Sequence, residues 1–242
     1  MTVVATAGPK TLDQVTGWFP HADQLLFEWF LNYQAIRDIR GDLLELGVYF
    51  GKSAIFTGRF LREGETFTVC DLFESEAPDA ANRSEMSDSY STLQREAFEA
   101  NYRAFHPALP RVVQGPSSTI LNHVRPGTCR FVHIDASHLY EHVKGDIVAA
   151  RTVLDSGGIV VLDDYRTEHT PGVAAAVWEA VFVAGLRPIC LSGQKFYGTW
   201  GDPAPWQHAL LGWAVYQPQL RMSRQRIAGA RVLRAAYRAI QK

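Results

Sequence analysis

Acidic residues and a histidine stand at the ends of two apolar segments, a placement that suits a catalytic centre. Asp135 ends the stretch Arg130–Asp135 and is followed by His138, while Asp163 and Asp164 end the stretch that begins at Gly158. Three carboxylates at neighbouring strand ends would repel one another unless a positive charge neutralised them. Hard divalent cations with oxygen ligands commonly do so. The pattern predicts that Asp135, Asp163 and Asp164 bind a divalent cation.

A glycine-containing turn follows an earlier apolar segment of the chain. The segment 45–53 reads ELGVYFGKS, with Gly47 and Gly51 placed where a strand passes into a helix. Glycine lets a ligand approach the backbone there, and the helix start suits a carboxylate. Asp71, 20 residues beyond Gly51, ends the next strand and can accept hydrogen bonds from the hydroxyls of a ribose. These features predict a nucleoside cofactor.

The spacing of the glycines distinguishes between two such cofactors. A pyrophosphate of a nicotinamide dinucleotide requires G-x-G-x-x-G, whereas this chain has G-x-x-x-G preceded by Glu45. A carboxylate at that position would repel a pyrophosphate and would suit a sulfonium ligand that carries an ammonium group. The turn therefore favours S-adenosylmethionine.

From Gly41 onward, short apolar runs alternate with longer stretches of helical periodicity, which is typical of βαβ units around a parallel sheet. The last two runs are joined by three residues, Ser192 to Gln194, too few for a parallel crossover, so they should form a hairpin. We therefore expect an α/β fold with a doubly wound, Rossmann-like, seven-stranded, mostly parallel sheet. The predicted strands are Leu43–Leu46, Thr66–Asp71, Arg111–Gln114, Arg130–Asp135, Gly158–Asp163, Arg187–Leu191 and Lys195–Trp200.

Three further parts surround the predicted core at 41–202. Residues 1–40 should form a helical cap with two helices over 11–40. The insertion 73–106 leaves a strand at its carboxyl end, and we interpret its polar part 74–91 as a mobile cover without structure of its own; a plain insertion is the alternative. A helix should follow at 93–105. The extension 203–242 should contain a basic amphipathic helix over 221–242.

Composition narrows the class of protein. The chain has 24 basic and 25 acidic residues, but seven of the basic residues and no acid lie in 221–242, which leaves 17 against 25 elsewhere. This balance disfavours a nucleic-acid substrate. Contact of the basic segment with an anionic membrane surface or an acidic partner stays open, as does docking or subunit bridging. We expect a cytoplasmic protein without a transmembrane segment, three buried free cysteines, and a homodimer.

Six segments in order and spacing carry a resemblance to a known family. They read ELGVYxGKS, CDLFE, FxxN at 98–101, HIDASHxYE, GGIVVLDDY and GVAAAVW. Over roughly residues 41–200 the chain resembles the small-molecule O-methyltransferases of the macrocin and novobiocin type, within the class I S-adenosylmethionine-dependent methyltransferases.

The resemblance implies roles for individual residues. It implies that Gly47, Gly51 and Ser53 border the methionine part of the cofactor, that Asp71 holds the ribose and that Ser117 approaches the adenine. It also implies that Asp135, Asp163 and Asp164 bind magnesium. At 135–138 the chain reads DASH, where the antibiotic-tailoring enzymes tend to read aspartate, glycine, aspartate. The cofactor-binding residues expected in full are Glu45, Gly47, Tyr49, Gly51, Ser53, Asp71, Ser117 and Asp135.

The expected reaction is methyl transfer to a hydroxyl of a sugar or polyketide-like small molecule. Because the sulfonium is a good leaving group, the protein must mainly hold the oxygen in line and remove its proton. Two mechanisms remain open: a divalent cation binds the hydroxyl while His138 or Asp135 takes the proton, or His138 acts as the base without a metal. The alternative functions are other metal-dependent chemistry on the same fold, such as hydroxylation, and a non-catalytic binding module.

Overall fold

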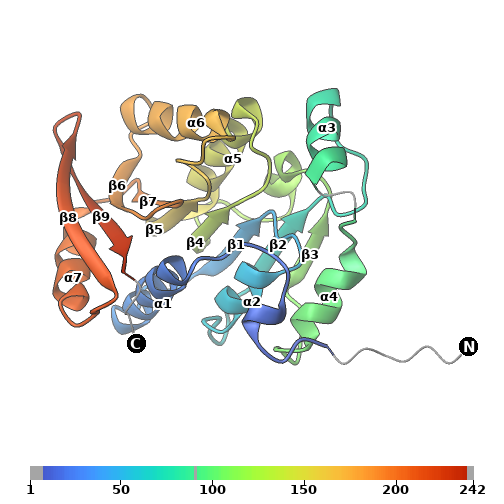
Figure 1. Ribbon diagram of the computed structural model, residues 1–242, viewed down its shortest axis with the longest axis horizontal. Coiled ribbons are helices and arrows are strands. Elements are labelled where there is room, and N and C mark those ends of the chain that lie inside the picture. The colour runs from blue at the N-terminus through green and yellow to red at the C-terminus, as the bar shows by residue number, and fades with distance from the viewer. Residues whose placement is uncertain (1–7, 90–91, 239–242) are drawn as a thin grey trace, which may run out of the picture.

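A computed structural model describes residues 8–89 and 92–238 of the chain. Within these residues, nine strands form one sheet in the order β3-β2-β1-β4-β5-β7-β6-β9-β8. Helices cover both of its faces (Figure 1). The predicted α/β fold with a mostly parallel, doubly wound sheet is confirmed, with two strands more than expected.

Five parallel strands form the half of the sheet that positions the site. Their order places β1 between β2 and β4, with β3 outside β2 and β5 outside β4. Most residues of β1, β2, β4 and β5 are buried, as the apolar runs predict for strands covered on both faces. These strands are β1 (Asp42–Leu46), β2 (Phe67–Asp71), β3 (Arg111–Gln114), β4 (Cys129–Ile134) and β5 (Leu154–Leu162).

Two layers of helices bury the two faces of the sheet in separate apolar clusters. One layer consists of α1 (His21–Ile36), α2 (Lys52–Gly58), α4 (Arg95–Arg103) and α7 (Ala204–Ala214). The other consists of the 3-10 segment η2 (Ser117–Asn122), α5 (Tyr140–Val153) and α6 (Pro171–Phe182). Cys70, Cys129 and Cys190 are free and buried, as predicted. No helix in the described part of the chain is long and apolar enough to cross a membrane.

The predicted hairpin gives the sheet its antiparallel strand. β6 (Arg187–Leu191) and β7 (Phe196–Thr199) pair antiparallel, and β7 also pairs antiparallel with β5. The short link between them leaves no room for a crossover helix. The hairpin therefore places Lys195, just before β7, beside the carboxyl end of β5.

The prediction of a basic helix at the C-terminal end is wrong. Residues 220–237 form a second hairpin of β8 (Leu220–Ile227) and β9 (Ala230–Tyr237), and β9 pairs parallel with β6. Ala228 and Gly229 both have positive φ, 48° and 80°, which is the geometry of a tight two-residue hairpin turn. Pairing with β9 satisfies backbone groups at the edge of β6, which a helix in the same place could not do. Residues 239–242 lie outside the described residues.

The N-terminal region and the insertion also differ from the prediction. Instead of two helices, a 3-10 turn, η1 (Leu12–Gln14), precedes α1, because Gly17 with φ 132° and Pro20 break the helical path. The insertion was expected to lack structure at 74–91, but it contains α3 (Ala80–Ser89), while residues 90 and 91 lie outside the described residues. The helix expected at 93–105 is present as α4.

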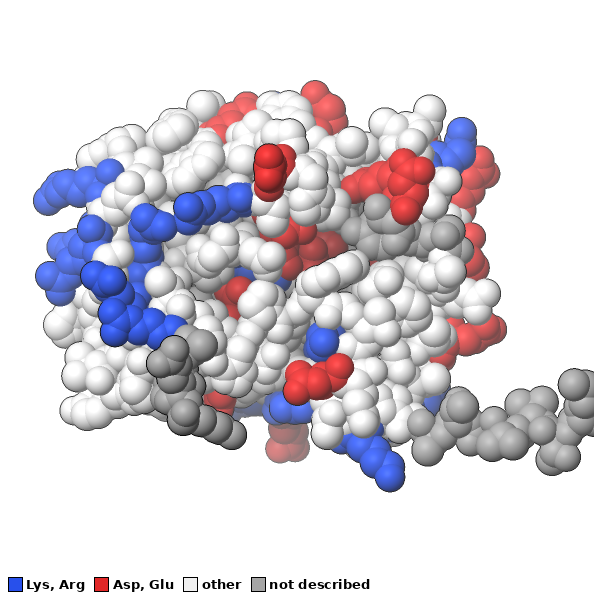
Figure 2. Space-filling view, viewed as in Figure 1, with Lys and Arg blue, Asp and Glu red and all other residues white. Residues whose placement is uncertain are grey.

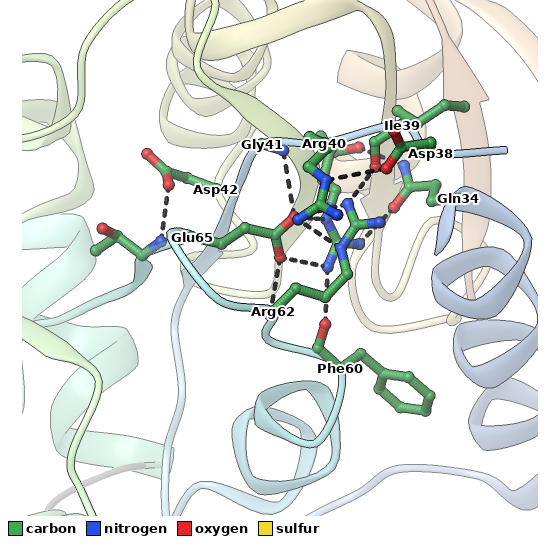
Figure 3. Close-up of polar contacts among 11 residues, drawn as sticks. Gln34, Asp38, Ile39, Arg40, Gly41, Asp42, Phe60, Arg62 and Glu65 are labelled. Carbon is green, nitrogen blue, oxygen red and sulfur yellow. Dashed lines mark hydrogen bonds and ion pairs between the residues drawn. The ribbon is translucent and has the colours of Figure 1, made fainter. Parts of the chain in front are cut away.

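A buried arginine joins the sheet to its covering segments. Arg130 on β4 is fully buried and forms an ion pair with Glu65, with a shortest N to O distance of 2.9 Å. It also donates to Gln34 of α1 and to the carbonyl of Phe60. Figure 3 shows the partners converging from α1 and from the loop between α2 and β2. Burial alone would raise the pKa of Glu65, but hydrogen bonds from Arg130 and Arg62 outweigh it and lower this pKa to about 2.

Replacing Glu65 with glutamine should destabilise the fold by about 3 kcal/mol at pH 7, because it leaves the buried charge of Arg130 without its partner. A carboxyl group with a lowered pKa stabilises the folded state above its unfolded pKa, and this stability is lost as pH falls toward the folded value. The difference between wild type and Glu65→Gln in urea unfolding should therefore shrink below about pH 4.5. An exposed acid, Glu63→Gln, is the control; an equal loss in both variants would contradict the account.

Candidate active site

A cavity of about 700 Å³ opens at the carboxyl ends of β1, β2, β4 and β5. Pockets of this size accommodate a cofactor together with a small substrate. Residues of α3, among them Asn82 and Met86, line it from the insertion, and residues of α5 line another wall. The cavity is therefore located where open parallel sheets bind ligands.

The turn after β1 approaches the end of β4 so closely that Gly47 must be glycine. Gly47 has φ 79°, and a Cβ there would collide with the carbonyl oxygen of Asp135. The amide of Asp135 donates to the carbonyl of Leu46 at 2.7 Å, which fixes the same approach. Gly51, the N-cap of α2, has φ 94°, and a Cβ would lie 2.9 Å from the ring of Phe98. Both predicted glycines therefore shape the turn at the cavity.

Asp71 lines the cavity, and its carboxylate already accepts hydrogen bonds from the backbone of the turn. Its Oδ2 accepts hydrogen bonds from the amides of Val48 at 2.7 Å and Tyr49 at 3.0 Å, and its Oδ1 accepts one from Phe73 at 2.9 Å. Burial raises the pKa of Asp71, and these three amides oppose the rise. A carboxylate offers about four lone-pair sites. The geometry thus leaves room for one ribose hydroxyl on Asp71, whereas the sequence suggested two.

Glu45 is fully buried and is not among the residues that line the cavity. Its Oε1 accepts hydrogen bonds from Ser53 and is 3.0 Å from Nδ1 of His133. Its Oε2 has no hydrogen-bond partner among the described residues. Ser53, which is bonded to Glu45, does line the cavity. The structure therefore brings Ser53 to the cavity wall and places the expected cofactor residue Glu45 behind it.

Aromatic residues form the wall of the cavity near the turn. Tyr49 has φ 50° and its ring stacks on Trp18 with the centroids 5.7 Å apart. Lys52 donates to the carbonyl of Gly17 at 3.0 Å, which ties the segment before α1 to the turn. All four residues line the cavity. The N-terminal segment is therefore part of the site.

The predicted acidic centre contains a buried cation of the protein itself. Lys195 is fully buried, and its Nζ is hydrogen-bonded to Asp163 and lies 3.2 Å from Nε2 of His133. Burial would lower the pKa of Lys195, but the carboxylates of Asp163, Asp135 and Asp23 outweigh it and raise this pKa. The lysine in turn holds the pKa of Asp163 below its usual range despite burial. Burial and the nearby Asp163 raise the pKa of Asp135.

His138 lies between two carboxylates. Its Nδ1 is 2.8 Å from Oε1 of Glu85 on α3, and its Nε2 is 3.2 Å from Oδ2 of Asp164. Burial would lower the pKa of His138, but the hydrogen bonds to Asp164 and Glu85 outweigh it and raise this pKa to about 10. Glu85 also accepts hydrogen bonds from the His138 amide and from Ser137, so the insertion is attached directly to the site. His138 is thus an imidazolium at neutral pH.

Two groups of side chains have ligand atoms within 4.8 Å of one another, as a metal site would require: His133, Asp135 and Asp163, and Asp135, His138 and Asp164. In the first group, Lys195 already contacts Asp163 and His133. In the second, both ring nitrogens of His138 contact carboxylates, and these contacts raise its pKa to about 10 despite burial. The sequence-based triad of Asp135, Asp163 and Asp164 does not form a group of this kind. The groups that could hold a cation therefore differ from the predicted triad, and both already contact charged side chains of the protein.

Three residues that sequence reasoning did not single out complete the site. Lys195 and Glu85 provide the charges described above, and Asp146 of α5 lines the cavity beside Ser117. Each belongs to an element far along the chain from its partner. The only signal in the sequence was the short hairpin that places Lys195 next to β5.

The sequence profile of a methyltransferase domain family matches residues 44–165, about half of the chain. The matched part includes the glycine turn, Asp71 and the acidic centre. The fold and this match define a class I methyltransferase, and the chain belongs to the methyltransferase domain family. Proteins of this class use S-adenosylmethionine, for which the cavity is suited. No curated protein sequence matches the chain.

Solved structures share the fold at low sequence identity. The O-methyltransferase NovP is 22% identical with a TM-score of 0.62, over 75% of this chain and 80% of NovP. The calicheamicin methyltransferase CalS11 is 20% identical with a TM-score of 0.53, over 74% of this chain and 79% of CalS11. A protein from Corynebacterium glutamicum is 14% identical with a TM-score of 0.51, over 76% and 83%.

Replacing Asp71 should test the turn and the ribose contact together. Asp71→Ala removes the acceptor for three amides and a hydroxyl, so affinity for S-adenosylhomocysteine in calorimetry should fall about 100-fold or more. Asp71→Asn keeps an oxygen for part of these bonds and should lose less. An acid that accepts a backbone hydrogen bond outside the cavity, Asp42→Asn, is the control. Unchanged affinity in Asp71→Ala would contradict the assigned position of the cofactor.

Proposed function

We propose that the protein transfers the methyl group of S-adenosylmethionine to a hydroxyl of a small molecule such as a sugar or polyketide-like natural product. The observation that carries the proposal is one cavity that is lined both by the glycine turn with Asp71 and by the charged residues Asp135, His138 and Asp164. We propose that the first set forms the cofactor end and the second set the acceptor end. NovP is named an O-methyltransferase and CalS11 a TDP-rhamnose 3'-O-methyltransferase, which supports this class of acceptor.

The chain must hold the acceptor oxygen in line with the sulfur and methyl group and take up its proton. We propose Asp135 for the proton transfer. His138 is a poor acceptor because both ring nitrogens are bound by carboxylates and the ring is already protonated. The His138 cation instead stabilises the negative charge that develops at the oxygen, while Lys195, which does not line the cavity, compensates the charge of Asp163.

The proposal does not include the magnesium ion expected from the sequence. The argument for it was the repulsion among three carboxylates, and Lys195 and His138 already balance that charge. We therefore propose that methyl transfer proceeds without a divalent cation. The acceptor is a small molecule and not a nucleic acid, because acids outnumber bases outside the C-terminal hairpin.

Several expectations about the protein's surroundings remain proposals of the same kind. Five exposed arginines lie on the C-terminal hairpin and Arg238 follows it directly, and Figure 2 shows basic side chains gathered over the hairpin at the left of the view. We propose that this surface makes a weak contact with an anionic partner or membrane surface. We also propose that the protein is a homodimer with a cytoplasmic location.

We propose that the chain is divided into a cap at 1–40, a core at 41–202 and an extension at 203–242. We also propose that the cover at 74–91 is mobile.

An acceptor screen tests the proposed function. Purified protein, S-adenosylmethionine and a panel of nucleotide sugars, glycosides and phenolic polyketides should yield S-adenosylhomocysteine and a product heavier by one methyl group, detected by mass spectrometry. The methyl group should be on oxygen by NMR. Transfer only to nitrogen or carbon acceptors would contradict the assignment to hydroxyls.

Two substitutions separate the roles of the residues at the acceptor end. With an accepted hydroxyl substrate, Asp135→Asn should lower kcat by about 10²- to 10⁴-fold, because it removes the proton acceptor. His138→Gln should lower kcat by less than about tenfold. The rate of the wild type should fall as pH falls, because only ionised Asp135 takes a proton. A larger loss in His138→Gln than in Asp135→Asn would assign the base to His138.

Removal of metal ions gives a separate prediction. After treatment with a chelator, kcat should stay within about twofold of its value in added Mg²⁺, because the chain supplies its own cations. Calorimetric titration with Mn²⁺ should show no binding at the site. Loss of activity on chelation that Mg²⁺ restores would contradict the proposal and support the metal site predicted from the sequence.

A further inference from the structure

The corner of the cavity beyond Asp71 contains a buried carboxyl group with an unpaired oxygen. Asp146 of α5 is 2% exposed, lines the cavity, and its Oδ2 has no hydrogen-bond partner among the described residues. A buried polar atom without a partner costs free energy unless a ligand or water pairs with it. The protein uses no other group in this corner for the chemistry described above.

The surroundings of Asp146 indicate what that ligand is. Burial raises the pKa of the Asp146 carboxyl to about 6, and the nearby Ser117, which follows β3, opposes the rise. Gly115 ties this loop to β2, with its amide donating to the carbonyl of Asp71 at 2.9 Å. The loop after β3 therefore lies beside Asp71, and α5, which carries Asp146, packs against this loop at η2.

The helix face around Asp146 is shaped for a flat base. His142, Gly145, Asp146 and Ala149 occur at helical spacing and all line the cavity. A Cβ at Gly145 would meet nothing within 4 Å, so the space beside Asp146 is open. Leu121 and Pro116 add apolar walls from the loop after β3. Apolar walls with one polar group are typical of sites that orient a ring by its edge.

We propose that Asp146 binds the exocyclic amino group of the cofactor's adenine, with Ser117 holding the carboxyl in place. Adenine offers a hydrogen-bond donor at N6, and an ionised carboxylate is an acceptor only. Hypoxanthine has an oxygen at that position, which a carboxylate repels. The proposal rests on the proposed function because it assumes the adenosyl cofactor. It assigns the selectivity of the site for adenine to a residue of α5.

Calorimetry with two nucleosides tests this assignment. The probes are S-adenosylhomocysteine and S-inosylhomocysteine, which differ at position 6 of the base. Wild type should prefer the adenosyl compound by about 100-fold, because a site built for an N–H group rejects the analogue that lacks it. Asp146→Asn, which can turn its amide NH₂ toward an oxygen, should reduce that preference at least about tenfold. Asp146→Ala should bind the adenosyl compound about 10- to 100-fold more weakly than wild type.

Controls separate binding of the base from support of the fold. Asp155→Asn changes a carboxyl that caps Gly157 on β5 and does not line the cavity, so it should leave the preference unchanged. A purely structural role of Asp146 would lower the melting temperature without ligand and weaken both nucleosides equally. An unchanged preference in Asp146→Asn, with wild type still binding the adenosyl compound, overturns the inference alone. Failure of wild type to bind either nucleoside overturns the proposed cofactor as well.

Discussion

The close contact between the β1 turn and the end of β4 is the constraint on which the site depends. Gly47 has no Cβ, so its backbone can approach Asp135, and the Asp135 amide bonds to Leu46. Asp71 then fixes the turn from the other side through the amides of Val48 and Tyr49. Three strand ends are thereby held together, and the cavity is located where they meet. A side chain at position 47 would separate the cofactor end from the acceptor end.

Charge is the second constraint at the site. Buried carboxylates near one another are stable only with compensating positive charge. Lys195 supplies it from the β6–β7 hairpin, and His138 supplies it while linked to Glu85 on the insertion. The acidic centre is therefore complete only when the hairpin and the insertion are both in place. This arrangement connects the cover over the cavity with the ionisation of the acceptor end.

Much of the fold follows from local sequence. Continuous apolar runs identified β4 and β5 as strands buried on both faces, and the three-residue link identified the β6–β7 hairpin. The C-terminal segment misled because Ile227, Ala230 and Leu233 fit helical spacing, although Ala230 is exposed and Leu233 is buried on β9. Strands form because Ala228 and Gly229 make a tight turn and because β9 can pair with the edge of β6. That edge is remote in sequence and gives no local signal.

The site was predictable in type and less so in detail. The glycines, Asp71 and the paired aspartates could be identified because turns and strand ends follow from the local pattern. Lys195, Glu85 and Asp146 could not, because their partners depend on how helices and hairpins pack against the sheet. The same packing changed the interpretation of the acidic residues from metal ligands to partners of protein cations, and placed Glu45 beneath the cavity rather than in its wall.

The central claim is that this cavity binds the adenosyl cofactor without help from a metal. Isothermal titration of the chelator-treated wild-type protein with S-adenosylmethionine tests it most directly. The account predicts binding of one molecule per chain in the micromolar range, unchanged when Mg²⁺ is restored. No binding under either condition would contradict the cofactor assignment, and binding that requires Mg²⁺ would contradict the role given to Lys195 and His138.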